Sequence, residues 1–300
     1  MSKEIRPHRL GRVSLLATVL LMGVGLGIAC LTLPTLAETT SASEQPNQPL
    51  DLPNYDRTGE ALRLSSVMTL YMPGITKDYC PSITGESYES LPVSEWQPAE
   101  RPAEQHGDLN LALRGYAPTV AGLGLVDIGG SDPKAPQLVG LFDTLRSPSF
   151  AAAYRVNNWD WGCNCRGEPI EEQEVSLVEL AVTPGEIIHV PNSGYDIGGG
   201  YRVLVLYASI TRLTLKYTSN DSIWPGYAIH LENVCVAPDL LNRYRTLDSA
   251  GRHELPALKA GKAIGRALGD RVGVAIRDGG SFLDPRWRYD WWQGYLRAAK

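Results

Sequence analysis

Two tryptophan-rich segments carry the residue types in this chain that could bind a ligand directly. The first contains Trp159 and Trp161 beside a cysteine-rich loop, and the second contains Trp287, Trp291 and Trp292 among arginines. An indole ring can stack on a flat ligand such as a sugar, or pack against an arginine guanidinium. The same tryptophans could instead cover the end of a sheet or clamp the domain, so packing remains the alternative for both segments.

Four cysteines lie beyond the first 37 residues: Cys80, Cys163, Cys165 and Cys235. An even number predicts two disulfides if the chain is exported to an oxidising compartment. Because a bridge between Cys163 and Cys165 would close a very tight ring, we expect each of them to pair with either Cys80 or Cys235. Both of those connectivities stay open. A metal site that uses the Cys163-Asn164-Cys165 pair is the rival interpretation.

The sequence contains no assembled motif of the common hydrolases. It has neither a Gly-x-Ser-x-Gly elbow nor a His-Glu-x-x-His helix. His189 and His230 each lie within an alternating strand pattern, where a histidine is usually a satisfied structural residue. The acidic segment from Glu168 to Glu174 offers carboxylates for glycosidic acid–base catalysis, but only their separation in space would decide that role. These patterns lean away from an enzyme, with a peptidoglycan-type hydrolase as the alternative.

The segment from residue 186 to residue 236 predicts the sheet around which the rest of the chain is organised. Four strands follow one another there, at residues 186–190, 201–209, 212–218 and 227–236, with Gly, Pro, Asn and Asp in the turns. In the third strand, Leu213, Leu215 and Tyr217 alternate with Arg212, Thr214 and Lys216. That alternation predicts a strand with one face in solvent.

Further strands are predicted at residues 62–71, 109–116 and 271–277. Helices are predicted from Pro136 to Arg146 and from Pro238 to a stop near Gly251, because apolar residues recur there at helical spacing. We therefore expect residues 56–300 to form a single, mainly β domain. Its core would be an antiparallel sheet, barrel-like or arranged as a sandwich, with two short helices and disulfides that staple it.

The first 37 residues predict export. Lys3, Arg6, Arg9 and Arg12 precede an uncharged apolar segment at residues 13–36, which is the pattern of a signal peptide. The segment is also long enough to remain as an uncleaved membrane anchor, and lipidation at Cys30 is a third option. Residues 38–55 are polar and would form a flexible tether. The domain would then be extracytoplasmic, either secreted or anchored to the outer face of the membrane.

The charge balance argues against a nucleic acid as the partner. The chain has a net charge of −5, and the part beyond residue 37 has about −8, from 24 basic and 32 acidic residues. A general nucleic-acid binder neutralises phosphates with an excess of basic side chains. We therefore expect no nucleic-acid partner.

Several short pieces between residues 186 and 286 occur in a familiar order. They are Val190-Pro191-Asn192-Ser193-Gly194 before Gly200-Tyr201, then Ile229-His230-Leu231, Gly261-Lys262-Ala263-Ile264-Gly265 and Asp284-Pro285. This order resembles that of the lysostaphin-type (LytM-like) zinc endopeptidase domains, in a distant and degenerate form. In that family, zinc is held by a histidine and an aspartate four residues apart and by the second histidine of a His-x-His strand.

By this resemblance, His230 would be a catalytic histidine rather than a zinc ligand. The candidates for metal ligands are His189 with Asp196 and His106 with Asp108, although neither pair has the spacing of the family. The closing strand, at residues 273–276, contains no histidine. Since a zinc hydrolase needs about three protein ligands and an open position for water, the resemblance implies the scaffold without the metal chemistry. No cofactor is expected, and zinc would be present only in the alternative.

Together these patterns predict a non-catalytic binding module on a peptidase-like scaffold outside the cytoplasm. Its partner would be a cell-wall or surface glycan or an envelope protein, and residues 13–36 would contact the membrane if they are not cleaved. The alternative is a cell-wall hydrolase or metallopeptidase.

Overall fold

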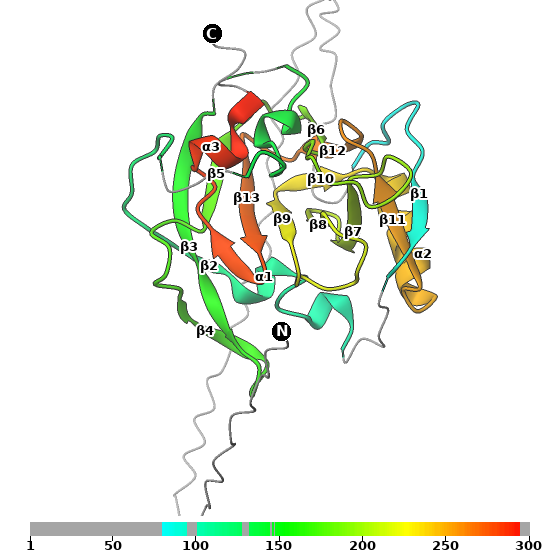
Figure 1. Ribbon diagram of the computed structural model, residues 1–300, viewed down its shortest axis with the longest axis horizontal. Coiled ribbons are helices and arrows are strands. Elements are labelled where there is room, and N and C mark those ends of the chain that lie inside the picture. The colour runs from blue at the N-terminus through cyan, green and yellow to red at the C-terminus, as the bar shows by residue number, and fades with distance from the viewer. Residues whose placement is uncertain (1–79, 95–100, 128–131, 145, 147, 295–300) are drawn as a thin grey trace, which may run out of the picture. The chain divides into compact units, whose positions relative to one another are not determined.

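The computed structural model of the chain describes residues 80–94, 101–127, 132–144, 146 and 148–294 (Figure 1). All of these residues belong to one compact unit that spans residues 68–300. The predicted leader, the tether and the strand at residues 62–71 lie outside the described residues. Among the described residues, no helix is long and apolar enough to cross a membrane.

An antiparallel sheet of 11 strands forms the centre of the domain. Its main path runs β1-β11-β7-β8-β9-β13-β5-β3-β2, while β14 pairs with β13 and β4 pairs with β3. The strands are β1 (Glu89–Pro92), β2 (Tyr116–Pro118), β3 (Phe150–Asp160), β4 (Cys165–Pro169), β5 (Leu177–Ala181), β7 (Val203–Ala208), β8 (Arg212–Lys216), β9 (Tyr227–Glu232), β11 (Glu254–Leu258), β13 (Arg271–Asp278) and β14 (Ser281–Leu283). The predicted fold class, mainly β with an antiparallel sheet, is confirmed. The sheet is open and does not close into a barrel.

A second sheet of three strands pairs β10 (Val234–Val236), β12 (Ala263–Ala267) and β6 (Ile187–His189). The chain passes from β9 in the large sheet to β10 in the small sheet at Asn233, whose φ of 60° lies in the left-handed region. Asparagine tolerates this conformation better than most residues. The single strand predicted at residues 227–236 is therefore two strands in two sheets.

The helices are α1 (Leu111–Arg114), α2 (Pro238–Ser249) and α3 (Arg288–Trp291), with 3₁₀ turns η1 (Ala103–Gln105) and η2 (Leu138–Leu141). The second predicted helix is confirmed as α2, which begins with Pro238 in its first turn. The first predicted helix is reduced to η2. The strand predicted at residues 109–116 is wrong, because Leu111 and Arg114 are both buried at helical spacing in α1, and only β2 follows in extended form.

The predicted wet face of β8 is also wrong. Thr214 and Lys216 are 1% and 0% exposed, because other segments cover the second face of the sheet. The hydroxyl of Thr214 donates a hydrogen bond to the carbonyl oxygen of Leu109, 2.6 Å away, just before α1. The loop between β8 and β9 covers Lys216. Both faces of β8 are consequently covered, and the second face holds buried polar side chains with hydrogen-bond partners.

The disulfides are Cys80–Cys235 and Cys163–Cys165, so both of the expected connectivities are wrong. Cys163 and Cys165 lie at the end of the β3–β4 hairpin, whereas Cys235 is buried in β10. Figure 1 shows β4 at the lower end of the domain and β10 in its upper part. Asn164 adopts a φ of 53°, which brings the two flanking Cα atoms to 5.3 Å. The small ring that contains the Cys163–Cys165 disulfide can therefore close because Asn164 adopts a left-handed backbone conformation.

Candidate functional site

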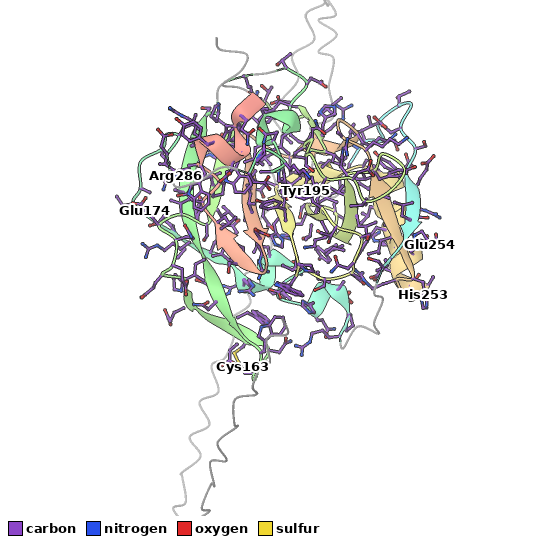
Figure 2. All side chains as sticks on the ribbon, viewed as in Figure 1. Cys163, Glu174, Tyr195, His253, Glu254 and Arg286 are labelled. Carbon is purple, nitrogen blue, oxygen red and sulfur yellow. A yellow bond between two sulfur atoms is a disulfide. The ribbon has the colours of Figure 1, made fainter. Side chains whose placement is uncertain are left out.

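The β3–β4 hairpin extends from the main sheet and carries the first tryptophan-rich segment. Trp159 pairs with Arg166 and Asp160 pairs with Cys165 across the two strands. Arg166 donates hydrogen bonds to the carbonyl oxygens of Leu113 and Ala112, each 3.1 Å away. Figure 2 shows Cys163 at one end of the domain, away from Tyr195 and Arg286. The hairpin is thus anchored to α1 through Arg166, one residue from its turn, while the turn itself is exposed.

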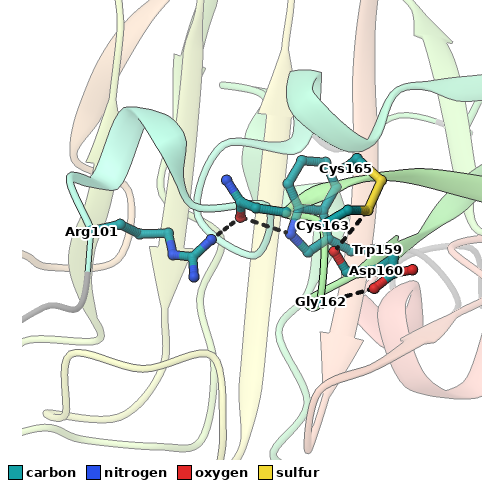
Figure 3. The surroundings of a disulfide bond; sticks show 7 residues. Arg101, Trp159, Asp160, Gly162, Cys163 and Cys165 are labelled. Carbon is teal, nitrogen blue, oxygen red and sulfur yellow. Dashed lines mark hydrogen bonds between the residues drawn. A yellow bond between two sulfur atoms is a disulfide. The ribbon is translucent and has the colours of Figure 1, made fainter.

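Asn164 fixes the turn at the end of this hairpin, beside the Cys163–Cys165 disulfide that Figure 3 shows. Its Oδ1 atom accepts hydrogen bonds from a guanidinium nitrogen of Arg101 and, at 3.3 Å, from Nε1 of Trp159. Oδ1 of Asp160 accepts a hydrogen bond from the backbone N–H of Gly162 at 2.7 Å. Side chains from four positions therefore hold the turn in addition to the strand pairing.

Four side chains gather here, and we call them the aromatic tip: Arg101, His106, Trp159 and Trp161. The ring centroid of Trp161 lies 5.0 Å from that of His106 and 6.3 Å from that of Trp159. The guanidinium carbon of Arg101 lies 5.6 Å from the centroid of Trp161. Trp161 is nevertheless 45% exposed, so part of its indole remains open to a ligand.

Trp159 is less open than Trp161 because it packs against the backbone of Gly107. A Cβ atom at position 107 would lie only 2.5 Å from Cδ2 of Trp159. Burial lowers the pKa of His106. The carboxylate of Asp108 opposes that shift, and the guanidinium of Arg101 reinforces it. His106 is therefore neutral at pH 7, and the guanidinium of Arg101 supplies the positive charge of the aromatic tip.

The second tryptophan-rich segment lies in the core. Trp291 and Trp292 are 0% exposed, and their Nε1 atoms donate hydrogen bonds to the carbonyl oxygens of Asp284 and Pro285 at 2.8 and 3.0 Å. Trp287 stacks on Trp291 with 6.3 Å between the ring centroids. Neither Trp291 nor Trp292 has exposed surface for stacking on a sugar, and Trp287 is partly buried against the same core. The packing alternative accounts for this segment.

The four candidates for metal ligands do not come together. Nε2 of His189 lies 3.1 Å from Oδ1 of Asp143, and Asp196 pairs with Arg202 at 3.6 Å. His106 accepts a hydrogen bond at Nδ1 from the backbone N–H of Asp108. Within the described ranges, no group of three or more His, Cys, Asp and Glu side chains could hold a metal ion.

His230 lies in the interior of β9 and is 1% exposed. Its Nδ1 atom is 3.0 Å from the hydroxyl oxygen of Thr214, and Nε2 is buried without a hydrogen-bond partner. Burial lowers the pKa of His230 to about 3, and Arg277 adds to that shift. The imidazole ring is therefore neutral, and it does not reach the surface where a substrate could bind. The catalytic role of His230 stays a prediction.

Sequence patterns missed two sets of polar contacts, one buried around Asp108 and one partly exposed around Asp132. Asp108 joins Arg114 and Arg277, which come from opposite ends of the domain's sequence. Asp132 accepts hydrogen bonds from the hydroxyls of Tyr195 and Tyr227 at 2.9 and 3.1 Å, beside a cavity of about 220 Å³. These contacts link residues up to 169 positions apart, and no local spacing signals such pairs.

Comparison of this chain with models of protein families, with curated proteins and with solved structures finds no match in any of the three.

Proposed function

We propose that this chain is a non-catalytic, extracytoplasmic binding module whose aromatic tip binds a cell-wall or surface glycan. The observation that carries the proposal is Trp161, which is 45% exposed on a hairpin end that other side chains hold in place. A sugar presents an apolar C–H face and a rim of hydroxyls. The indole of Trp161 would stack on the apolar face of the sugar. The guanidinium of Arg101, whose N–H donors have a fixed planar geometry, would donate hydrogen bonds to the hydroxyls.

Pre-organisation favours this role. A ligand that binds to a mobile loop loses affinity because the loop must be ordered on binding. Here Asn164 is held by Arg101 and Trp159, and Arg166 ties the hairpin to α1. The aromatic tip therefore needs little ordering when it meets a ligand.

We further propose that the scaffold is a degenerate form of the lysostaphin-type peptidase domain. The pieces that carry the resemblance fall in β9, β12 and β13 and in the segments that follow β6 and β14. β9 pairs with β13, so that His230 faces Ala275, while β12 pairs with β6. These pieces are neighbours in two adjacent sheets, which is what a shared scaffold requires.

The proposed location outside the cytoplasm is consistent with the long-range Cys80–Cys235 disulfide, because such bonds persist in oxidising compartments.

A metal-dependent hydrolase is the less favoured function, since His189, Asp196 and Asp108 are each engaged by a different partner. It would require stoichiometric zinc in the purified protein and a wall-degrading activity that His230→Ala abolishes.

The test is a retention assay with the full-length chain, purified in mild detergent. The polymers are peptidoglycan, chitin, cellulose and lipopolysaccharide, each as an insoluble or immobilised phase. We expect at least one polymer to retain the protein and Trp161→Ala to weaken its affinity about tenfold, roughly 1.4 kcal/mol.

The matched control is Trp224→Ala. Trp224 is 66% exposed in the loop between β8 and β9 and is no part of the aromatic tip. This variant should bind as the wild type does. Retention by none of the polymers, or equal losses in both variants, would count against the proposed function.

A further inference from the structure

The two disulfides of this domain differ in the length of the loop that they close and in their exposure. Cys80 and Cys235 are 155 positions apart, and Cys235 is buried within the small sheet. Cys163 and Cys165 are two positions apart, and both lie exposed at the end of the β3–β4 hairpin. A disulfide that closes a long loop removes much conformational entropy from the unfolded chain, whereas one that closes a minimal loop removes far less. The exposed bridge thus contributes little as a staple.

We propose that the Cys163–Cys165 disulfide is a thiol–disulfide exchange site that accepts two electrons from a dithiol of a protein partner. Exchange requires that a thiolate reach one of the sulfur atoms along the S–S axis. Exposure of both cysteines at a hairpin end provides that access. Exposed disulfides are the labile and catalytic ones more often than buried disulfides are.

The hairpin end can release the bridge without unfolding. Asn164 stays bound to Arg101 and to Trp159, neither of which involves a sulfur atom. The pairing of Trp159 with Arg166 and the bonds from Arg166 to Ala112 and Leu113 are likewise independent of the disulfide. Reduction would therefore leave the two thiols near each other and ready to be reoxidised.

One guanidinium lies beside the turn that carries the pair. Arg101 donates a hydrogen bond to the side chain of Asn164, the residue between the two cysteines. A guanidinium near a cysteine stabilises its thiolate. A disulfide whose reduced form is stabilised is the stronger oxidant of a partner's thiols.

The exchange moves two electrons and two protons from the partner's dithiol to the Cys163–Cys165 bridge. A thiolate of the partner attacks one sulfur, a mixed disulfide forms, and the other cysteine leaves as a thiolate. The second thiolate of the partner then attacks the partner's own sulfur in the mixed disulfide and displaces the remaining cysteine. The partner ends with a disulfide, Cys163 and Cys165 end as two thiols, and two protons move from the partner's thiols to these cysteines.

A redox titration tests this with the disulfides as each other's control. The full-length chain with Cys30→Ser is equilibrated in glutathione buffers of increasing [GSH]²/[GSSG], quenched in acid and alkylated. Peptide-resolved mass spectrometry then gives the reduced fraction of each pair. We expect the Cys163–Cys165 pair to be half reduced at a [GSH]²/[GSSG] ratio at least a hundredfold lower than the ratio that half reduces the Cys80–Cys235 pair. This corresponds to a difference of about 60 mV in reduction potential. Equal midpoints, or the reverse order, would overturn the proposal.

Activity is tested with a peptide that carries two reduced cysteines. One equivalent of the oxidised chain should oxidise it at least tenfold faster than the Cys163→Ser/Cys165→Ser variant does, since that variant retains Cys80–Cys235. Equal rates would overturn the proposal. Both measurements follow the oxidation state of the cysteines and need no glycan. A failure of the exchange proposal can therefore be distinguished from a failure of the proposed binding function.

Discussion

Asp108 accepts a hydrogen bond from Nη1 of Arg277 at 2.6 Å, and the two residues are 169 positions apart in the sequence. The same Oδ1 atom accepts a hydrogen bond from Nη2 of Arg114, also at 2.6 Å. Both guanidinium groups are almost completely buried, whereas the carboxylate keeps some exposure. One carboxylate therefore offsets two buried positive charges and joins the segment before α1 to β13.

Replacing Asp108 should destabilise the domain strongly. Asp108→Ala leaves two buried guanidinium groups without a counter-charge, which costs about 3 to 5 kcal/mol of unfolding free energy. Urea denaturation measures this change. The control is Asp196→Ala, since Asp196 pairs with Arg202 at the surface and its loss should cost less than about 1 kcal/mol. Similar losses in both variants would mean that the Asp108 cluster contributes no more than a surface ion pair.

His230 should make the stability of the domain fall in mild acid. Burial lowers its pKa to about 3, below the ordinary value of 6.5, so between these values the unfolded chain binds a proton that the folded chain does not. The contribution of His230 is present above pH 6.5 and is lost as the pH falls toward 3, by about 1.4 kcal/mol per pH unit inside that window. Urea unfolding of the wild type and of His230→Gln from pH 7 to pH 4 measures the difference in slope. Parallel curves would show that His230 takes up a proton as readily in the folded chain as in the unfolded chain.

Local patterns in the sequence identified the β class, the strands near residues 186–236, helix α2 and strand β13. Each of these elements is encoded by alternation or helical spacing between Pro and Gly residues, and such signals lie within about ten positions of one another. The segment at residues 109–116 failed because its alternating leucines fit a strand as well as a helix. In the folded chain, Arg114 of α1 and Arg277 of β13 both bind Asp108, and the contact with Arg277 is not local.

The aromatic tip was predicted in part. Trp159 and Trp161 were visible as a pair beside the cysteines, but Arg101 and His106 come from a segment more than 50 positions earlier. The C-terminal tryptophans have a similar local composition and are buried. Composition alone does not separate a tryptophan that covers a core from one that faces a ligand, since only the packing of the whole sheet decides its exposure.

Lys216 should produce a second pH dependence, in the alkaline range. Its Nζ atom donates hydrogen bonds to the carbonyl oxygens of Ile223 at 2.6 Å, Gly226 at 2.9 Å and Pro225. Burial lowers the pKa of Lys216 to about 7 from its ordinary 10.5, although Asp278 acts in the opposite direction. The stability that this group contributes is present above pH 10.5 and is lost as the pH falls toward 7.

The measurement for Lys216 is the unfolding free energy from pH 7 to pH 10. Relative to Lys216→Met, the wild type should gain stability as the pH rises, by up to about 1.4 kcal/mol per pH unit. The variant fills the same space without a titrating group, so it serves as the reference for all other groups that titrate in this range. A constant difference between the two proteins would show that the three carbonyls hold the ammonium charged throughout.

The two disulfides should differ in their effect on stability. In the chain-entropy model, a bridge between residues 155 positions apart contributes about 5 kcal/mol, whereas a bridge across two positions contributes about 1.5 kcal/mol. We therefore expect Cys80→Ser/Cys235→Ser to lower the midpoint of urea unfolding far more than Cys163→Ser/Cys165→Ser does. Because Cys235 is buried, part of the larger loss also comes from placing a hydroxyl in the small sheet, and Cys80→Ala/Cys235→Ala separates that part. If the hairpin variant were the less stable protein, the exposed bridge would be a structural brace, and the exchange role proposed for it would lose its physical basis.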